Sequence, residues 1–301
     1  SNNTLMWSII SIAIDNQNFI NSKNLQMRQA LTLLAFLIFA SGISFGQQDP
    51  MFTKYMFNSL VFNPAYAGSK DHMYLGLLHR TQWYEINGAP STQTITLHTP
   101  LKNDRVAVGA TMVNDKIGPT NNLGANLVYA YRIPLQKDGK LALSIGLQAG
   151  MENFRADWGD VTLENPDDPP FTGTENRMLP NFGAGIYIYG TNFYLGASSP
   201  HLIEYDLRDN IVNPFYARQA RHYYFMAGGV IPLGGKNLIF KPSLLYKNVG
   251  LLAGSSKIDE FQNIGAPSEL DIDISFLIEE TLWVGASFRT ALEAFQNKSS
   301  Y

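Results

Sequence analysis

The sequence contains no cysteine, which excludes disulfides, thiol nucleophiles, cysteine-ligated zinc and a lipoprotein anchor. Charged residues make up only 16% of the 301 residues, whereas soluble domains carry about 25%. The formal net charge is −3, so the chain lacks the basic excess that a nucleic-acid-binding protein uses to contact phosphates. After Gly46 there is no apolar run of roughly eighteen residues, which excludes a transmembrane helix in that part of the sequence.

Residues 1–46 carry the pattern of a targeting segment. Residues 27–46 have a short positive start, an apolar run over 30–40 and small residues before Gln47, which is the three-part pattern of a secretory signal peptide. The apolar run is too short to span about 30 Å of hydrocarbon, so a cleaved signal is favoured over a membrane anchor. We interpret residues 1–26, which precede the signal, as an upstream artefact. The mature chain is therefore expected to begin near residue 47 and to leave the cytoplasm.

The dominant pattern after residue 47 is strict alternation of apolar residues with small or polar ones. Every second residue of 141–152 is apolar, and 182–189, 270–278 and 282–289 repeat the pattern. Such a run, about eleven residues long, has the length of a tilted strand that crosses a bilayer. A soluble β-sandwich alternates as well, so the period alone leaves both folds open.

The lengths of the connections separate these two folds. Short connections alternate with longer ones along the chain, and three of the longer ones span 157–177, 199–218 and 249–267. This alternation is typical of outer-membrane barrels, and the small and charged residues on the alternate faces suit a wet or plugged lumen. We therefore predict an all-β transmembrane antiparallel outer-membrane β-barrel, which must close because unpaired backbone groups are costly in lipid. The strands are predicted at 72–85, 92–100, 105–115, 122–134, 140–156, 178–189, 192–198, 219–232, 237–248, 268–278 and 281–289.

The predicted strand count is odd, although single-chain bacterial barrels have even numbers of strands. Residues 291–296 have the pattern of an opening twelfth strand that residues 297–301 do not complete. The barrel, residues 71–301, is therefore expected to be incomplete at its C-terminus, with about 11–12 strands present.

No arrangement of residues predicts catalysis or a cofactor. The acidic residues between 157 and 168 could hold calcium, but they lack EF-hand spacing and also fit a solvated outer loop. The sequence has no Gly-x-Ser-x-Gly elbow. Four histidines are scattered without metal-ligand spacing: His79, His98, His201 and His222. We interpret the protein as non-enzymatic, with no metal and no cofactor.

Short motifs follow one another in a fixed order from residue 47 to about residue 290. They include residues 55–58 and 63–69, then 80–83, 165–169, 180–183, 199–202, 221–224 and 241–243. In this order they resemble the PorP/SprF family, outer-membrane proteins of the type IX secretion system of gliding and related Bacteroidetes. The motif residues that we select as candidate functional positions are Tyr55, Asn58, Asn63, Pro64, Ala65, Tyr66 and Gly68 near the N-terminus, and Arg80, Trp83, Pro166, Pro200, His201, Arg221 and His222 in the barrel.

The resemblance implies a fold, a location and partners. It implies a fourteen-stranded barrel in the outer membrane that supports secretion or surface anchoring of adhesins, as in gliding motility, by scaffolding. The implied partners are the lipid bilayer, the type IX secretion machinery, and secreted adhesins or their C-terminal domains. It implies no enzymatic activity and no nucleic-acid partner.

The segment 47–70 is too apolar to remain in water, because exposing each aromatic side chain costs roughly 1.5–3 kcal/mol. We predict that this segment folds into the barrel mouth as a plug; a flexible periplasmic leader is the alternative. An N-terminal Asn-Pro-Ala hatch also occurs in FadL-type channels, so residues 63–65 leave a second function open. In that alternative the protein is an outer-membrane channel for small hydrophobic solutes.

Overall fold

The computed structural model describes residues 55–102, 104–137, 140–157, 174–206, 218–219, 221–233, 237–249, 268–279 and 281–291. All of them belong to one compact unit, residues 46–301, which is distinct from residues 1–45. The predicted upstream segment and signal peptide lie outside the described residues, as do residues 47–54 of the predicted plug.

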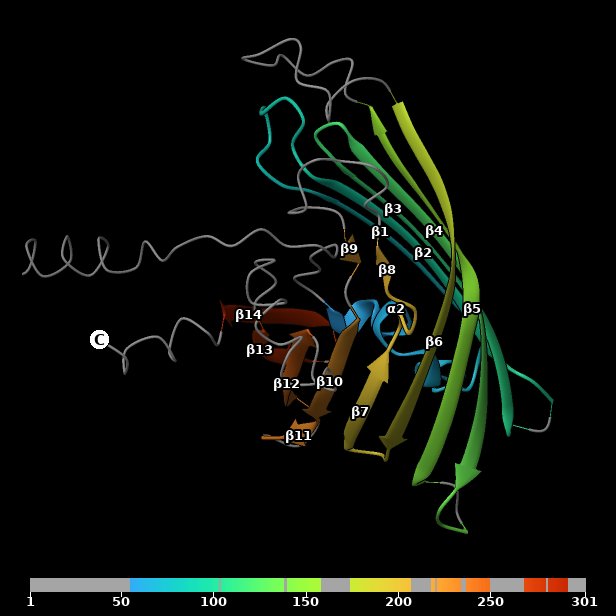
Figure 1. Ribbon diagram of the computed structural model, residues 1–301. Helices are drawn as coiled ribbons and strands as arrows, with labels where there is room; N and C mark the ends of the chain where they lie inside the picture. The colour runs from blue at the N-terminus through green and yellow to red at the C-terminus, as the bar shows by residue number, and fades with distance from the viewer. Residues whose placement is uncertain are drawn as a thin grey trace, which may run out of the picture. The chain divides into compact units, whose positions relative to one another are not determined.

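One continuous antiparallel sheet contains all eleven predicted strands, close to their predicted bounds (Figure 1). Successive strands pair in chain order, except that β7 pairs directly with β10 and β10 with β12. The strands of this path are β1 (Tyr74–Thr81), β2 (Ser91–Pro100), β3 (Val106–Ile117), β4 (Thr120–Pro134), β5 (Ala142–Asp157), β6 (Thr174–Tyr189), β7 (Phe193–Ser199), β10 (His222–Gly229), β12 (Leu238–Val249), β13 (Glu269–Ile278) and β14 (Leu282–Ala291).

Three further strands have two residues each. Strand β11 (Ile231–Pro232) extends the sheet by pairing with β12. Strands β8 (Tyr205–Asp206) and β9 (Arg218–Gln219) form a separate pair; β8 lies in the predicted 199–218 connection, and β9 spans the boundary between it and the predicted strand 219–232. The alternation of side chains did not predict β8 and β9, because two residues are too few to show a period.

The two faces of the sheet are inverted relative to a water-soluble protein. On β5, Ser144 and Gln148 are buried while Leu147 is 56% exposed. On β13, Asp273 is buried while Ile274 is 47% exposed. A sandwich in water would bury the apolar face, whereas an outer-membrane barrel presents it to lipid. The predicted all-β fold of outer-membrane barrel type is therefore confirmed over the sandwich; the fourteen-strand closure stays a prediction.

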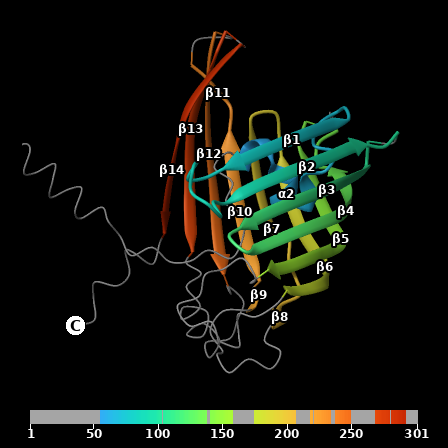
Figure 2. The same ribbon diagram turned by 90° about the horizontal axis from the view of Figure 1, so that it is seen from above.

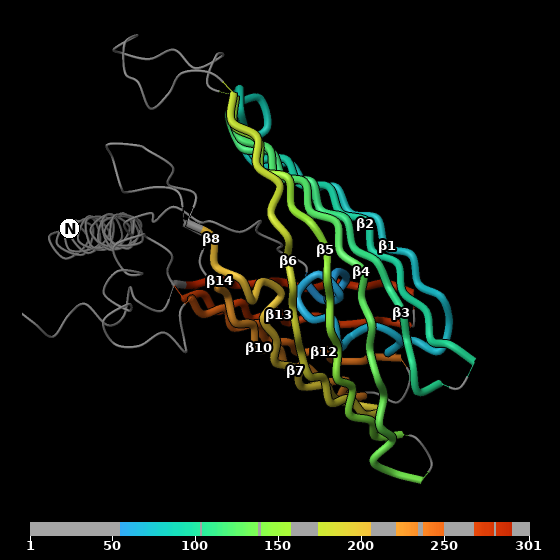
Figure 3. The backbone as a smooth tube through the Cα atoms, turned by 45° about the vertical axis from the view of Figure 1, so that its right-hand side comes forward, coloured from blue at the N-terminus to red at the C-terminus, as the bar shows by residue number. Residues whose placement is uncertain are grey.

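The N-terminal segment, defined here as residues 55–68, lies on the buried face of the sheet. It consists of η1 (Tyr55–Phe57), α2 (Ser59–Phe62) and η2 (Pro64–Tyr66), and the strands curve around it in Figures 2 and 3. An apolar core forms where this segment meets β10 and β12, with Phe62 next to Tyr224 and Leu245. Among the described residues, no helix has the length and apolar character needed to cross a membrane.

The inverted faces give a testable expectation for the exposed leucines. Leu147→Arg is expected to lower the free energy of unfolding in a lipid bilayer by at least about 2 kcal/mol, because a cation on the lipid face is costly near the bilayer centre. Leu135→Arg is the matched control, since Leu135 is equally exposed but lies in the connection after β4. Urea unfolding in bilayers measures both; equal losses would contradict the lipid-facing assignment.

Candidate functional site

The side chain of Asn63 holds the N-terminal segment both to itself and to the sheet. Its Oδ1 accepts a hydrogen bond from the Ala65 amide at 2.9 Å, which caps η2. Pro64 takes the first position of η2, where its fixed φ and missing N–H are tolerated. The Asn63 Nδ2 donates to the carbonyl of Ile186 on β6 at 2.9 Å. One fully buried amide therefore shapes the turn and attaches it to the sheet.

Three glycines on the inner face of the sheet make room for this turn. We call Gly146, Gly185 and Gly196 the glycine seat; they lie on β5, β6 and β7. A Cβ on Gly146 would lie 2.1 Å from the Ala65 amide nitrogen, and one on Gly185 would lie 2.1 Å from the Asn63 Oδ1. Glycine inside a strand often marks close approach of another backbone. Because the glycine seat has no side chains, it leaves room for the Asn-Pro-Ala turn.

The end of the segment is fixed against β2 and β3. The amide of Gly68 donates to His98 Nδ1 at 3.2 Å, so Nδ1 is the acceptor and the neutral ring carries its proton on Nε2. Gly68 has φ +73°, and a Cβ there would lie 2.3 Å from the Cβ of Ala107. Both the backbone conformation and the lack of space require glycine at this motif position. The Tyr66 ring packs edge-on against His98, with centroids 5.5 Å apart.

Aromatic packing anchors the start of the segment. Tyr55 is 1% exposed and meets the ring of Phe62 edge-on, and Phe62 meets Tyr224 in the same way at 5.2 Å. Burial raises the pKa of both Tyr55 and Tyr66 above the ordinary tyrosine value, so both stay neutral. Asn58 is buried just before α2. Burying each large apolar side chain contributes roughly 1.5–3 kcal/mol, which adds to the hydrogen bonds of Asn63.

The chain after β7 also returns to the inner face. Gln148 Nε2 donates to the carbonyl of Pro200 at 3.0 Å, and His201 Nδ1 lies 3.2 Å from Glu152 Oε1. Gly183 leaves space for this approach, because a Cβ there would lie 2.5 Å from the Pro200 oxygen. Two motif residues, Pro200 and His201, thus occupy the inner face of β5 and β6.

Of the other described positions, His222 joins the core at Tyr224, on which its ring stacks with centroids 6.3 Å apart. Arg80 lies on β1 and His222, at the start of β10, is 1% exposed. Arg221 directly precedes β10. Trp83 lies beyond the end of β1 and is 67% exposed. Pro166 lies outside the described residues. The structure therefore brings together the seven N-terminal motif residues but distributes the barrel motif residues over several places.

The sequence interpretation missed the glycine seat, although a signal for it was present. Gly146 and Gly185 both fall on the small or polar face of an alternating strand, the face that turns inward. A strand glycine on an inward face predicts that a backbone approaches it. The sequence alone did not say which backbone, because Gly146 and Ala65 are far apart in the chain.

The fold and the seat together define a class of protein: a membrane protein with an antiparallel sheet whose outer face is apolar and whose polar inner face holds its own N-terminal segment. The family described as "Type IX secretion system membrane protein PorP/SprF" matches residues 44–300. The chain therefore belongs to the PorP/SprF family of type IX secretion system membrane proteins, which confirms the resemblance of the motifs. The family and the sheet point to the outer membrane.

No curated protein matches the sequence significantly. Among solved structures, the chain is similar to the crystal structure of BamA from Haemophilus ducreyi lacking POTRA domains 1-3. The two are 9% identical with a TM-score of 0.29, and the match covers 73% of this chain and 61% of the BamA chain. The chain thus spans less than two thirds of that structure, and a likeness this slight does not bear on function.

Proposed function

We propose that the protein supports secretion or surface anchoring of adhesins by acting as an outer-membrane scaffold of the type IX secretion system. Membership of the PorP/SprF family supports the link to secretion. The observation that favours a scaffold is the N-terminal segment, whose Asn63 is fully buried between the segment and β6. A barrel whose inner face is filled by its own chain offers surfaces for partners rather than a path for solutes.

The connections favour a direction for this scaffold, with the two-residue turn between β3 and β4, at the opposite end, as the exception. The turn between β6 and β7 has few residues, as has the turn between β13 and β14, and both lie at the same end of the sheet. Short turns face the periplasm in outer-membrane barrels and longer loops face outward. In our proposal the short-turn end therefore meets the periplasmic secretion machinery. The long connections within 157–177, 199–218 and 249–267 meet exported adhesins or their C-terminal domains.

The test is deletion of the gene in its native host, followed by mass spectrometry of the cell surface and the culture medium. Secreted adhesins are expected to fall strongly at the surface and to accumulate inside the cell. Expression of the unchanged chain should restore them. Chemical cross-linking of that chain should recover secretion components or adhesins. Unchanged surface adhesins after deletion would overturn the proposal, and a simultaneous loss of uptake of hydrophobic solutes would favour the FadL-like channel instead.

A further inference from the structure

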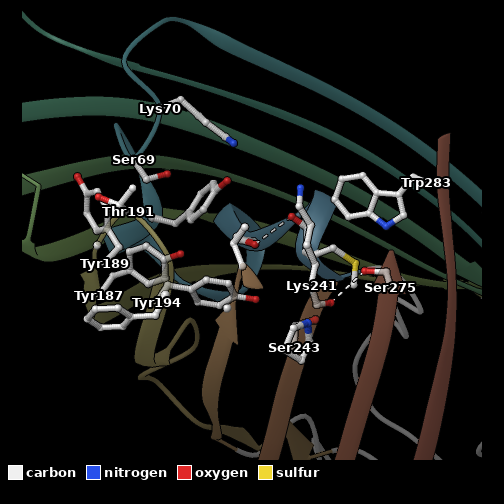
Figure 4. Close-up of a pocket in the computed structure, with 18 residues that line it drawn as sticks. Ser69, Lys70, Tyr187, Tyr189, Thr191, Tyr194, Lys241, Ser243, Ser275 and Trp283 are labelled. Carbon is white, nitrogen blue, oxygen red and sulfur yellow. Dashed lines mark hydrogen bonds between the residues drawn. The ribbon is translucent and has the colours of Figure 1, made fainter. Parts of the chain in front are cut away.

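A cavity of about 250 Å³ lies between the N-terminal segment and the strand ends that carry the short turns (Figure 4). Its walls come from residues just after that segment, from both sides of the β6–β7 turn, and from β12, β13 and β14. This volume corresponds to about eight water-sized groups, enough for a small organic molecule. We call it the lysine cavity, after Lys70 and Lys241.

Two ammonium groups share this cavity. Figure 4 shows the side chains of Lys70 and Lys241 reaching into it from opposite walls. Lys241 Nζ lies 4.2 Å from the centroid of the Trp283 ring. In the described part of the chain, neither lysine forms an ion pair with a carboxylate. Two ammonium groups in one cavity favour the entry of an anion.

The remaining lining supplies donors for the same kind of ligand. No aspartate or glutamate is among the described residues that line the cavity. The hydroxyl groups of Ser69 and Ser243 also line the cavity; Ser69 lies beside the hydroxyl of Tyr66, and Ser243 beside that of Tyr194. Figure 4 also shows the tyrosines of β6 and β7 on one wall, including Tyr187 and Tyr194. Hydroxyl and ammonium groups can all donate to an oxyanion.

The lining also contains apolar side chains. Met56, Phe193 and Trp283 line the cavity together with the donor groups. A cavity lined by ammonium and hydroxyl groups together with apolar and aromatic side chains matches a ligand with an anionic end and a short apolar end. We propose that the lysine cavity binds the anionic group, a carboxylate or a phosphate, of a small amphipathic molecule that enters from the short-turn end of the sheet.

This site is coupled to the seating of the N-terminal segment. Met56, Ser59 and Tyr66 contribute to the cavity, so a ligand held there contacts the segment and the strands at once. A ligand that binds only when the N-terminal segment lies on the sheet stabilises that arrangement, and tighter binding stabilises it more. The bound anion therefore contacts both the segment and β12 and stabilises their association. Such binding does not depend on whether the protein scaffolds adhesins.

The test is a ligand-observed NMR titration of the full chain in detergent micelles with benzoate, phenyl phosphate and uncharged benzamide. Benzoate and phenyl phosphate are expected to bind saturably and benzamide at least tenfold more weakly, because hydrogen bonds to charged groups contribute most to such a site. Lys70→Gln combined with Lys241→Gln should weaken both anions by about tenfold or more for each lysine. Lys102→Gln, an exposed lysine between β2 and β3 outside the cavity, is the matched control.

Two additions keep the test decisive. If the double variant does not refold, Lys70→Gln alone is used, since Lys70 lies outside the strands and Lys70→Arg should restore binding. Repeating the titration in phosphatidylcholine bilayers with and without phosphatidylglycerol distinguishes the source: competition by the anionic lipid assigns the site to a lipid head group, and its absence to a soluble anion. No saturable binding, equal binding of benzamide, or unchanged binding by the folded lysine variants would each overturn the proposal.

Discussion

Gly146→Ala is expected to displace the Asn-Pro-Ala turn from the inner face of the sheet. The added Cβ would lie 2.1 Å from the Ala65 nitrogen, 2.3 Å from the Pro64 carbonyl carbon and 2.4 Å from the Ala65 Cα. These are backbone atoms, which cannot rotate away as the end of a flexible side chain can. Overpacking of this kind costs about 3 kcal/mol, so the free energy of unfolding in bilayers should fall by that amount or residues 55–68 should leave their place.

Protease cleavage and single-channel conductance distinguish a loss of stability from displacement of the segment. Displacement should make residues 55–68 accessible to protease and, if these residues act as the predicted plug, raise the single-channel conductance. Gly124→Ala is the control, since the nearest atom to its Cβ is the Cγ of the Glu152 side chain at 3.3 Å, and it should cost less than about 1 kcal/mol. If Gly146→Ala and Gly124→Ala behave alike in stability, cleavage and conductance, the seat does not hold the turn and the predicted plug loses its support.

The strands were predictable because their signal is local. Each residue of a strand faces the opposite side from its neighbours, so the alternation in 141–152 identifies both the strand and its lipid face without knowledge of any partner. The structure bears this out on β5, where Ser144 is buried and Leu147 is exposed. Chain-order pairing then follows, because short connections join antiparallel neighbours.

The elements inside the sheet carry no comparable signal. Helix α2 has four residues, too few to show a helical period or to be stable alone, and tertiary burial of Leu60 and Phe62 maintains it. The aromatic content and Asn63 stand out in the sequence, but the residues of the sheet that they contact do not. The alternation indicates which residues face inward, but not which of them contact one another across the interior. For the same reason the meeting of Lys70 with Lys241 was not predicted from the sequence.

The seat also explains why the motif positions carry the residues they do. Asn63 supplies one acceptor and one donor at the required places, Pro64 starts η2, and Gly68 adopts a left-handed conformation against Ala107. The sheet sets two of these requirements, the donor of Asn63 through Ile186 and the glycine at 68 through Ala107, and the turn itself sets the others. The N-terminal motif and the strand glycines therefore form one packing contact. A search for catalytic or metal-binding patterns does not detect such a contact.

Asn63→Ala is expected to lower the free energy of unfolding in bilayers by about 2–4 kcal/mol. The substitution leaves the buried Ala65 amide without its acceptor and removes the bond to the Ile186 carbonyl. A buried donor without a partner costs more than the hydrogen bond contributes net, because desolvation is no longer compensated. Hydrogen exchange of the peptide 55–68 should accelerate as well, which urea unfolding alone would not localise.

A second variant of Asn63 tests whether its Nδ2 donor contributes to stability, and Asn114→Ala is the control. Asn63→Asp keeps the shape and the acceptor for Ala65 but places an oxygen against the Ile186 carbonyl, so it should destabilise the seat rather than rescue it. Asn114→Ala removes an exposed amide that donates to Gln93 at 2.8 Å, and it should change stability by less than about 0.5 kcal/mol. Stability and exchange rates in Asn63→Asp equal to those of the unchanged protein would show that the bond to β6 contributes nothing. The attachment of the segment would then rest on the glycine seat and the aromatic packing of Tyr55 and Phe62.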